Sequence, residues 1–212
     1  MSSGRSLWAT CLSTHISSIP EHLRVPGEGA DFTYPLTVGK RYRVAAMIWV
    51  RSSLQFVVRN DYNQLETAYE ALFSLNSRVL PAHWQFARID DQPTSAHRAG
   101  DVVWGFPEFV NDGVHVLHSD DPVAAVRVRT AVWRDEVVSR IRDVIADLAT
   151  VIAPKAQFDA VELLAFDETE LAMQTVTWAI VDSRNDVDPA IDEELAAIAQ
   201  LMDLGIRNPD RL

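Results

Sequence analysis

The chain has 212 residues, of which 48% are hydrophobic, and carries a formal net charge of −11 at pH 7. This composition excludes a disordered chain and fits one large domain or two small ones. The acidic balance argues against general nucleic-acid binding, which needs clustered Lys and Arg, and the single cysteine, Cys11, fits a reducing compartment. No apolar run approaches the roughly 20 residues that cross a bilayer. Residues 1–5 also lack the features of a secretory signal, so we expect a cytoplasmic protein.

Short β-strands are predicted in the first hundred residues. An opening strand at residues 6–12 is followed by an irregular, Pro- and Gly-containing connection with one helical turn around residues 21–23. Aromatic and β-branched residues then predict a hairpin from residues 42–50 and 55–58, after a turn at residues 37–40. A second hairpin is predicted from residues 71–75 and 83–89. Four or five antiparallel strands at these intervals predict a small curled sheet or barrel.

The middle of the chain connects this β module to helices. Residues 90–101 have the composition of a linker, and we interpret the apolar residues 102–107 as a plug over a core. Asp121-Pro122 predicts a helix start, because proline at the first helical position loses no hydrogen bond. Residues 123–152 contain no Gly or Pro and predict one long helix or two shorter ones, bounded by Pro154.

Residues 156–203 carry nearly all of the net charge, with twelve Asp and Glu against Arg184 alone. The 155 residues before them hold seventeen acids against sixteen bases. Apolar residues from Phe158 to Phe166 recur every three or four positions, which predicts a helix that buries them. Asp167 is predicted to cap the next helix, and Asp188-Pro189 to start the last one. The face of this stretch is suited to meet something cationic.

These elements predict an α+β protein. Its expected organisation is an antiparallel β module at residues 1–100, a connecting segment with a helix at residues 101–132, and an acidic helical module at residues 133–212.

No catalytic constellation is evident, because the chain lacks GxxxxGK[ST], GxGxxG, GxSxG and HExxH. His115 and His118, followed by Asp120 and Asp121, are the nearest approach to a metal site. The full zinc pattern is missing, however, so a surface turn is favoured. Cys11 and His15 suggest a nucleophile and base, although a cysteine between apolar neighbours is more often an inert core residue. We therefore predict no catalytic residue, metal or cofactor.

Short motifs in the first part of the chain resemble a family of small bacterial proteins. This resemblance implies no known chemistry. The resemblance covers roughly residues 7–130. The segments that carry it are Leu36-Thr37-Val38-Gly39-Lys40 with Tyr42, Ala71-Leu72-Phe73, Trp84-Gln85-Phe86, and Trp104-Gly105-Phe106-Pro107-Glu108-Phe109-Val110-Asn111-Asp112 followed by Asp120-Asp121-Pro122.

A second set of motifs lies in the last part of the chain. Its residues are Phe158, Val161-Glu162-Leu163-Leu164, Glu170-Leu171-Ala172, Trp178-Ala179-Ile180-Val181-Asp182, Asp188-Pro189 and Leu201-Met202-Asp203-Leu204-Gly205-Ile206. This pattern resembles the helical MafI-type immunity proteins of bacterial polymorphic toxin systems. The resemblance covers about residues 134–206, although Val187-Asp188-Pro189 replaces the family's usual Ile-Ser or Val-Ser before the last helix. It implies a small cytoplasmic inhibitor that binds and silences a cognate toxin domain.

The predicted function is that of an immunity protein that acts by direct protein contact and catalyses nothing. Its implied partner is a toxin domain such as a cationic nuclease, with no nucleic acid or membrane partner, because patterned carboxylates suit a cationic surface. The alternatives are a regulatory or scaffold protein without a toxin partner and a metal-dependent hydrolase that uses His115 and His118. The candidate partner-binding residues are Asp182, Asp186, Asp188, Asp192, Glu193, Glu194 and, as an anchor, Trp178.

Two plainer interpretations compete with this set. The carboxylates also fit a solvated helix exterior that keeps the protein soluble. An indole such as that of Trp178 is usually buried, with its N–H group hydrogen-bonded.

Overall fold

The structure is a computed structural model that describes residues 6–24, 29, 31–50, 53–77, 79–89, 101–107, 109–113, 122–183 and 185–207. The described residues form two compact units, the first from residues up to Val132 and the second from Trp133 onward. An antiparallel β-sheet lies in the first unit and helices make up the second, so the predicted α+β class is confirmed. No helix in the described ranges is long and apolar enough to cross a membrane.

Among the described residues, the sheet of the first unit has seven strands, and every pairing between them is antiparallel. Five strands lie in the order β4-β3-β2-β1-β5, while β7 pairs with both β2 and β6. The strands are β1 (Trp8–Cys11), β2 (Arg41–Val50), β3 (Ser53–Arg59), β4 (Leu65–Tyr69), β5 (Phe73–Leu75), β6 (Gln85–Arg88) and β7 (Val102–Gly105).

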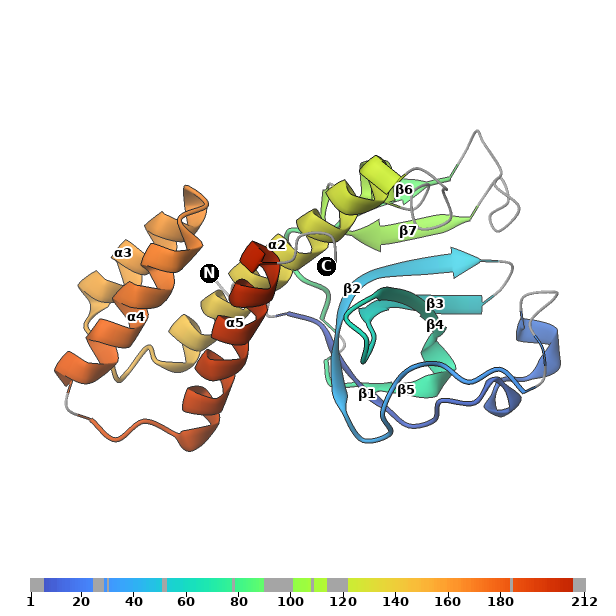
Figure 1. Cartoon of the computed structure of the whole chain (residues 1–212), viewed down its shortest axis with the longest axis horizontal. Helices are drawn as coiled ribbons and strands as arrows, with labels where there is room; N and C mark the ends of the chain where they lie inside the picture. The colour runs from blue at the N-terminus through green and yellow to red at the C-terminus, as the bar shows by residue number, and fades with distance from the viewer. Residues whose placement is uncertain are drawn as a thin grey trace. The chain divides into compact units, whose positions relative to one another are not determined.

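Strand β2 is the centre of the sheet, because one of its edges pairs with two different strands, one after the other along its length. Its first residues, 41–43, pair with β1, and residues 46–49 pair with β7. Along the other edge β2 pairs with β3, with a register shift between Val44 and Ala46. Such an irregularity bends a strand and increases its twist. Figure 1 shows the resulting curl of the sheet, which the strand spacing predicts.

Local signals located several elements correctly. The opening strand, the hairpin of β2 and β3, and the helical turn η2 (Glu21–Leu23) are confirmed. The predicted second hairpin is wrong, because β5 pairs with β1 and β6 pairs with β7. The predicted plug over the core at residues 102–107 is wrong, because residues 102–105 form strand β7. Strand β4 has no counterpart among the predicted strands. The predicted linker lies outside the described residues except at residue 101.

Two apolar clusters form the core of the first unit. One gathers Phe56, Tyr69 and Leu72 with neighbouring residues of β1 and β2. The other joins residues of β2 and β7 to Phe109 of the short π-helix η4 (Phe109–Gly113) and to Val128 in the first part of α2 (Pro122–Asp147). The remaining 3-10 turns are η1 (Ile16–Ser18) and η3 (Glu70–Leu72).

Gly105 permits the close packing of β7 in this second cluster. A Cβ atom placed on Gly105 would lie 3.1 Å from the Cβ of Ala46 and 3.4 Å from Cδ1 of Phe109. The 3.1 Å contact is tight, so a side chain at this position would require Ala46 or β7 to shift by a few tenths of an ångström.

The second unit consists of the last part of α2, α3 (Pro154–Ala165), α4 (Thr169–Ser183) and α5 (Pro189–Arg207). Its core includes Ile141 of α2, Leu148 directly after that helix, Val176 of α4 and Ile198 of α5. The indole Nε1 of Trp133 donates to the carbonyl oxygen of Leu201 at 2.8 Å, which joins α2 to α5. Helices α3 and α4 pack against each other as a hairpin, side by side in Figure 1.

The tight turn of this hairpin corrects the predicted role of Asp167. Asp167 has a positive φ of 66°, and the next amide, that of Glu168, donates to the carbonyl oxygen of Leu163 at 2.9 Å. This is the hydrogen-bond pattern that closes the C-terminus of a helix, so Asp167 ends α3 and does not cap α4. Its carboxylate instead pairs with Arg134 at 2.8 Å.

The predicted buried stripe of α3 is also wrong in most of its members. Ala160 and Leu164 are buried, but Phe158 and Phe166 are 67% and 73% exposed. The α3 sequence has apolar residues on more than one side, and only the side that carries Ala160 and Leu164 contributes to the core.

Candidate protein-binding face

The six predicted partner-binding carboxylates lie between the end of α4 and the first turns of α5. Asp182 is in the last turn of α4, Asp186 and Asp188 are in the connection, and the other three are in α5. Five of the six residues are exposed and Glu194 is half-buried. The structure therefore brings the set into one stretch, but it gives the members different roles.

Asp188 has a structural role at the start of α5. Its Oδ1 atom accepts a hydrogen bond from the amide of Ala190 at 2.9 Å, and its carbonyl oxygen accepts from the amide of Ile191 at 2.8 Å. Pro189 follows at the first helical position. This arrangement satisfies an amide that the helix itself leaves without a partner, and it confirms the predicted helix start.

Glu194 also has a structural role, as the partner of Arg140 on α2. The guanidinium Nε and Nη2 atoms of Arg140 lie 2.6 and 2.9 Å from the two carboxylate oxygens of Glu194. Arg140 is also 3.7 Å from Glu136, and only 12% of its side chain is exposed. A bidentate, largely buried pair of this kind holds α5 against α2, so Glu194 is poorly placed to serve a partner.

The other four carboxylates are uncompensated in the described part of the chain. They are exposed, and they form no hydrogen bond or ion pair with another described residue through their side chains. Their charge is thus directed to solvent. These four are Asp182, Asp186, Asp192 and Glu193.

Trp178 lies on the surface of α4, which contradicts the expectation that its indole is buried. Its exposed fraction is 69%, and Val181 and Leu171 on the same helix are also exposed. Val176 and Ala172 occupy the opposite, buried side. The helix therefore carries apolar residues on both sides, of which only one enters the core.

Sequence reasoning missed most of these exposed apolar residues. On α3, Phe158 and Val161 are exposed, as is Phe166 at the turn of the hairpin. Their three- and four-residue spacing predicts burial, and for these three residues that prediction is wrong. The available signal was the excess of apolar positions, since a short helix in a small bundle cannot bury all of its faces.

The hairpin that carries these side chains is strongly acidic. Residues 154–183 contain six Asp and Glu and one basic residue, Lys155. The Nζ atom of Lys155 lies 2.6 Å from Asp159, and Asp167 is paired with Arg134. Apolar side chains and mostly uncompensated carboxylates therefore share the exterior of α3 and α4.

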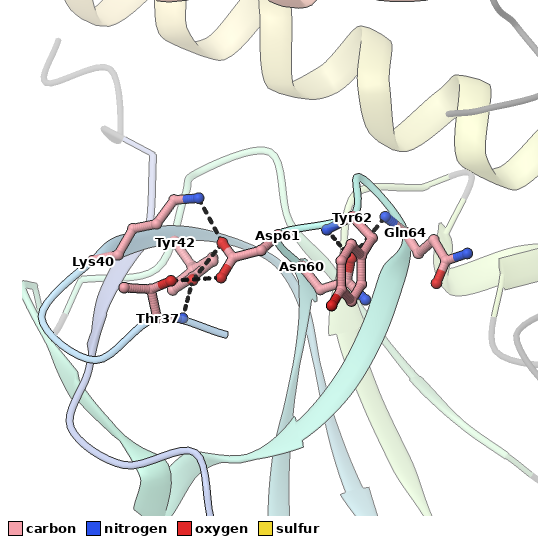
Figure 2. A network of polar contacts seen from close by, with 7 residues as sticks. All are labelled: Thr37, Lys40, Tyr42, Asn60, Asp61, Tyr62 and Gln64. Atoms are coloured by element: carbon pink, nitrogen blue, oxygen red, sulfur yellow. Dashed lines mark hydrogen bonds and ion pairs between the residues drawn. The ribbon is translucent and has the colours of Figure 1, made fainter. Parts of the chain in front are cut away.

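A polar cluster in the first unit surrounds Asp61 in the loop between β3 and β4 (Figure 2). Its carboxylate accepts from Lys40 Nζ at 2.6 Å, from Thr37 Oγ1 at 2.7 Å and from the Tyr42 hydroxyl at 2.8 Å. Thr37 and Lys40 flank the predicted turn, in which Gly39 has a φ of 83° that favours glycine. The network fastens this turn to the β3–β4 loop, which is a structural role.

Two pKa values are shifted in this network. Burial and, after it, the adjacent Asp61 carboxylate raise the pKa of Tyr42 to about 12, although the hydrogen bond from the Thr37 amide lowers it. Burial alone would raise the pKa of Asp61, but hydrogen bonds from Lys40, Thr37 and Tyr42 outweigh it, so that pKa falls below its usual 3.8. The folded state thus favours neutral Tyr42 and ionised Asp61.

We expect the first unit to lose stability as the pH rises from 10 to 12. A tyrosine with a folded pKa near 12 and an ordinary value of 10 stabilises the fold fully below pH 10. That contribution is lost as the unfolded chain ionises first. Urea denaturation between pH 8 and pH 12 would measure it. Tyr42→Phe should remove this alkaline decline, and an equally steep decline in the variant would assign it to other groups.

The candidates for catalysis do not assemble into a site in the described residues. Cys11 is buried on β1, where burial raises the pKa of its thiol and Sγ donates to the Ser13 carbonyl oxygen at 3.3 Å. His15 Nδ1 lies 3.2 Å from the Thr33 hydroxyl. No group of three His, Cys, Asp or Glu residues suited to a metal ion is found in the described ranges. His115 and His118 lie outside those ranges.

Comparison with known proteins provides no family for this chain. It matches no protein family, no curated protein and no solved structure.

Proposed function

We propose that this protein is a cytoplasmic immunity protein that binds a cognate bacterial toxin domain and silences it by direct contact. The observation that carries the proposal is the exterior of the helical unit, where large apolar side chains such as Trp178 stand exposed among uncompensated carboxylates. Exposed apolar groups rimmed by polar residues are typical of protein interaction sites. The resemblance of residues 134–206 to MafI-type immunity proteins agrees with this function.

The charge favours a toxin that acts on nucleic acid. Such an enzyme is cationic around its active site, because its substrate carries phosphate groups. Carboxylates on an inhibitor raise the rate of association with that surface and select the partner, while a few desolvated apolar anchors supply most of the affinity. An acidic helical unit with exposed anchors provides both kinds of group.

Growth rescue tests the proposal directly. The toxin domain encoded beside this chain is expressed in a bacterial host with and without the full-length protein, and growth is followed. We expect growth only when both are present, together with a complex that co-purifies from the rescued cells. Failure to rescue, or the lack of a toxin gene beside this one, would contradict the immunity function and favour a regulatory or scaffold role.

Charge reversal tests the electrostatic part of the proposal. Asp186, Asp192 and Glu193 are exposed, and their side chains have no partner among the described residues, so their replacement by Lys should preserve the fold. We expect the affinity for the toxin domain to fall about tenfold at low salt, and less at high salt where the charges are screened. Titration calorimetry at two salt concentrations would measure the change.

A matched variant separates local from overall charge. Glu21→Lys, Asp31→Lys and Glu70→Lys change the net charge by the same amount but lie in the first unit. They should weaken binding much less. An equal loss in both triple variants would indicate that only the overall charge matters.

A further inference from the structure

We propose that the docking site is one face of α4, formed by Leu171, Gln174, Trp178 and Val181, and that it receives a basic protein surface with an apolar pocket for the indole. We call these four residues the Trp178 face. The inference rests on the proposed function, because it takes a toxin domain as the partner. It places the main contact on α4, outside the acidic connection and α5.

The spacing of the four residues places them on one side of α4. They follow one another at intervals of three, four and three, which align along a helix of 3.6 residues per turn. All four are exposed, and Trp178 and Val181 are 69% and 65% exposed. The opposite side, with Ala172 and Val176, is buried in the core. The apolar members of this face, Leu171, Trp178 and Val181, therefore form an apolar stripe outside the core that the described residues of the unit form.

The stripe has the composition of an interface centre. Tryptophan is among the residues that contribute most to protein association, and such residues lie near the middle of a contact within a polar rim. Here the rim is acidic, because Glu170 adjoins Leu171 at one end and Asp182 adjoins Val181 at the other. Both carboxylates are exposed. About 18 Å of helix separates them at 1.5 Å per residue.

Charge decides between possible occupants. The α3–α4 hairpin carries six carboxylates against one lysine. A second copy of this chain would place like charges together, and nucleic acid or an anionic membrane surface would be repelled in the same way. A protein with Lys or Arg at the two ends of an apolar pocket complements both the stripe and its rim.

The test compares two aromatic side chains that are similarly exposed. Trp178→Ala and Tyr62→Ala, the latter in the first unit and 74% exposed, are prepared in the full-length chain and checked by circular dichroism. Dissociation constants are then measured with the toxin domain encoded beside this chain. We expect Trp178→Ala to weaken binding about thirtyfold and Tyr62→Ala to leave it within about threefold.

The outcomes separate this inference from the proposed function. If the Trp178→Ala variant binds the toxin domain as tightly as the wild-type chain, the Trp178 face is not the docking site, and the immunity function is unaffected. A larger loss in Tyr62→Ala would move the docking site to the first unit. If the wild-type chain does not bind the toxin domain, the immunity function fails, and the face is then tested by a probe of the same chemistry.

That probe is a synthetic amphipathic helix with leucine on one side and lysine on the other. The control peptide has glutamate in place of lysine. We expect the lysine peptide to bind the wild-type chain at least about tenfold more tightly than the glutamate peptide. We expect Trp178→Ala to abolish that binding and Tyr62→Ala to preserve it. Equal binding of the lysine peptide to all three proteins would overturn the Trp178 face independently of any toxin.

Discussion

Replacing Arg140 by Ala should lower the free energy of unfolding of the helical unit by about 3 kcal/mol. The guanidinium holds Glu194 through two short contacts and lies beside the buried Glu136. Its removal takes the bidentate cation from the half-buried Glu194 and a nearby cation from the buried Glu136. Urea denaturation followed by circular dichroism would measure the loss, which should appear as a lower midpoint.

The chain offers a matched control on α3. Lys155 forms an ion pair of the same length with Asp159, but its side chain is 84% exposed. Lys155→Ala should therefore change the stability by less than about 0.5 kcal/mol. Combining Arg140→Met with Glu194→Leu should recover part of the loss, because an apolar pair leaves fewer buried charges. Equal effects of Arg140→Ala and Lys155→Ala would show that the buried network contributes little.

Replacing Phe56 by Ala should destabilise the first unit by about 3–5 kcal/mol. The ring of Phe56 is fully buried in the cluster between the strands, with its centroid 5.6 Å from that of Phe73. Truncation leaves a cavity that a sheet held by long-range pairings cannot easily close. The control is Phe86→Ala on β6, where 61% of the side chain is exposed and the expected loss is about 1 kcal/mol or less.

The same variant shows whether the β unit contributes to neutralisation. If the helical unit carries the contact, Phe56→Ala should still rescue growth at a temperature at which the first unit is unfolded and the second remains helical by circular dichroism. If unfolding of the first unit abolishes growth rescue while the helical unit stays folded, part of the interface lies on the sheet.

The sequence predicted the elements whose signals are local. Proline at the first helical position marks α2 and α5, and Asp188 caps α5 as expected. The alternation of β-branched and aromatic residues located β2 and β3. These signals depend on neighbours within a few residues, which is why no knowledge of the tertiary structure was needed.

The wrong predictions concern strand pairing and side-chain burial, which depend on residues far apart in the sequence. Whether residues 73–75 pair with β1 or with a later strand depends on the route of the whole chain. Arg140 and Glu194 are 54 residues apart, so nothing local distinguishes Glu194 from the exposed Glu193 beside it. In α4 both sides of the helix are apolar, and only its packing partners determine that Val176 is buried and Trp178 is exposed.

The burial of Cys11 keeps the protein's single cysteine thiol away from the surface. It is the only cysteine in the chain, and its thiol is enclosed in the core with a raised pKa, so reagents that need an accessible thiolate should react with it slowly. A cysteine introduced at Gln174 would then be labelled selectively in the otherwise native protein. A fluorophore or photo-crosslinker attached there would report on whatever approaches α4, without first removing any natural residue.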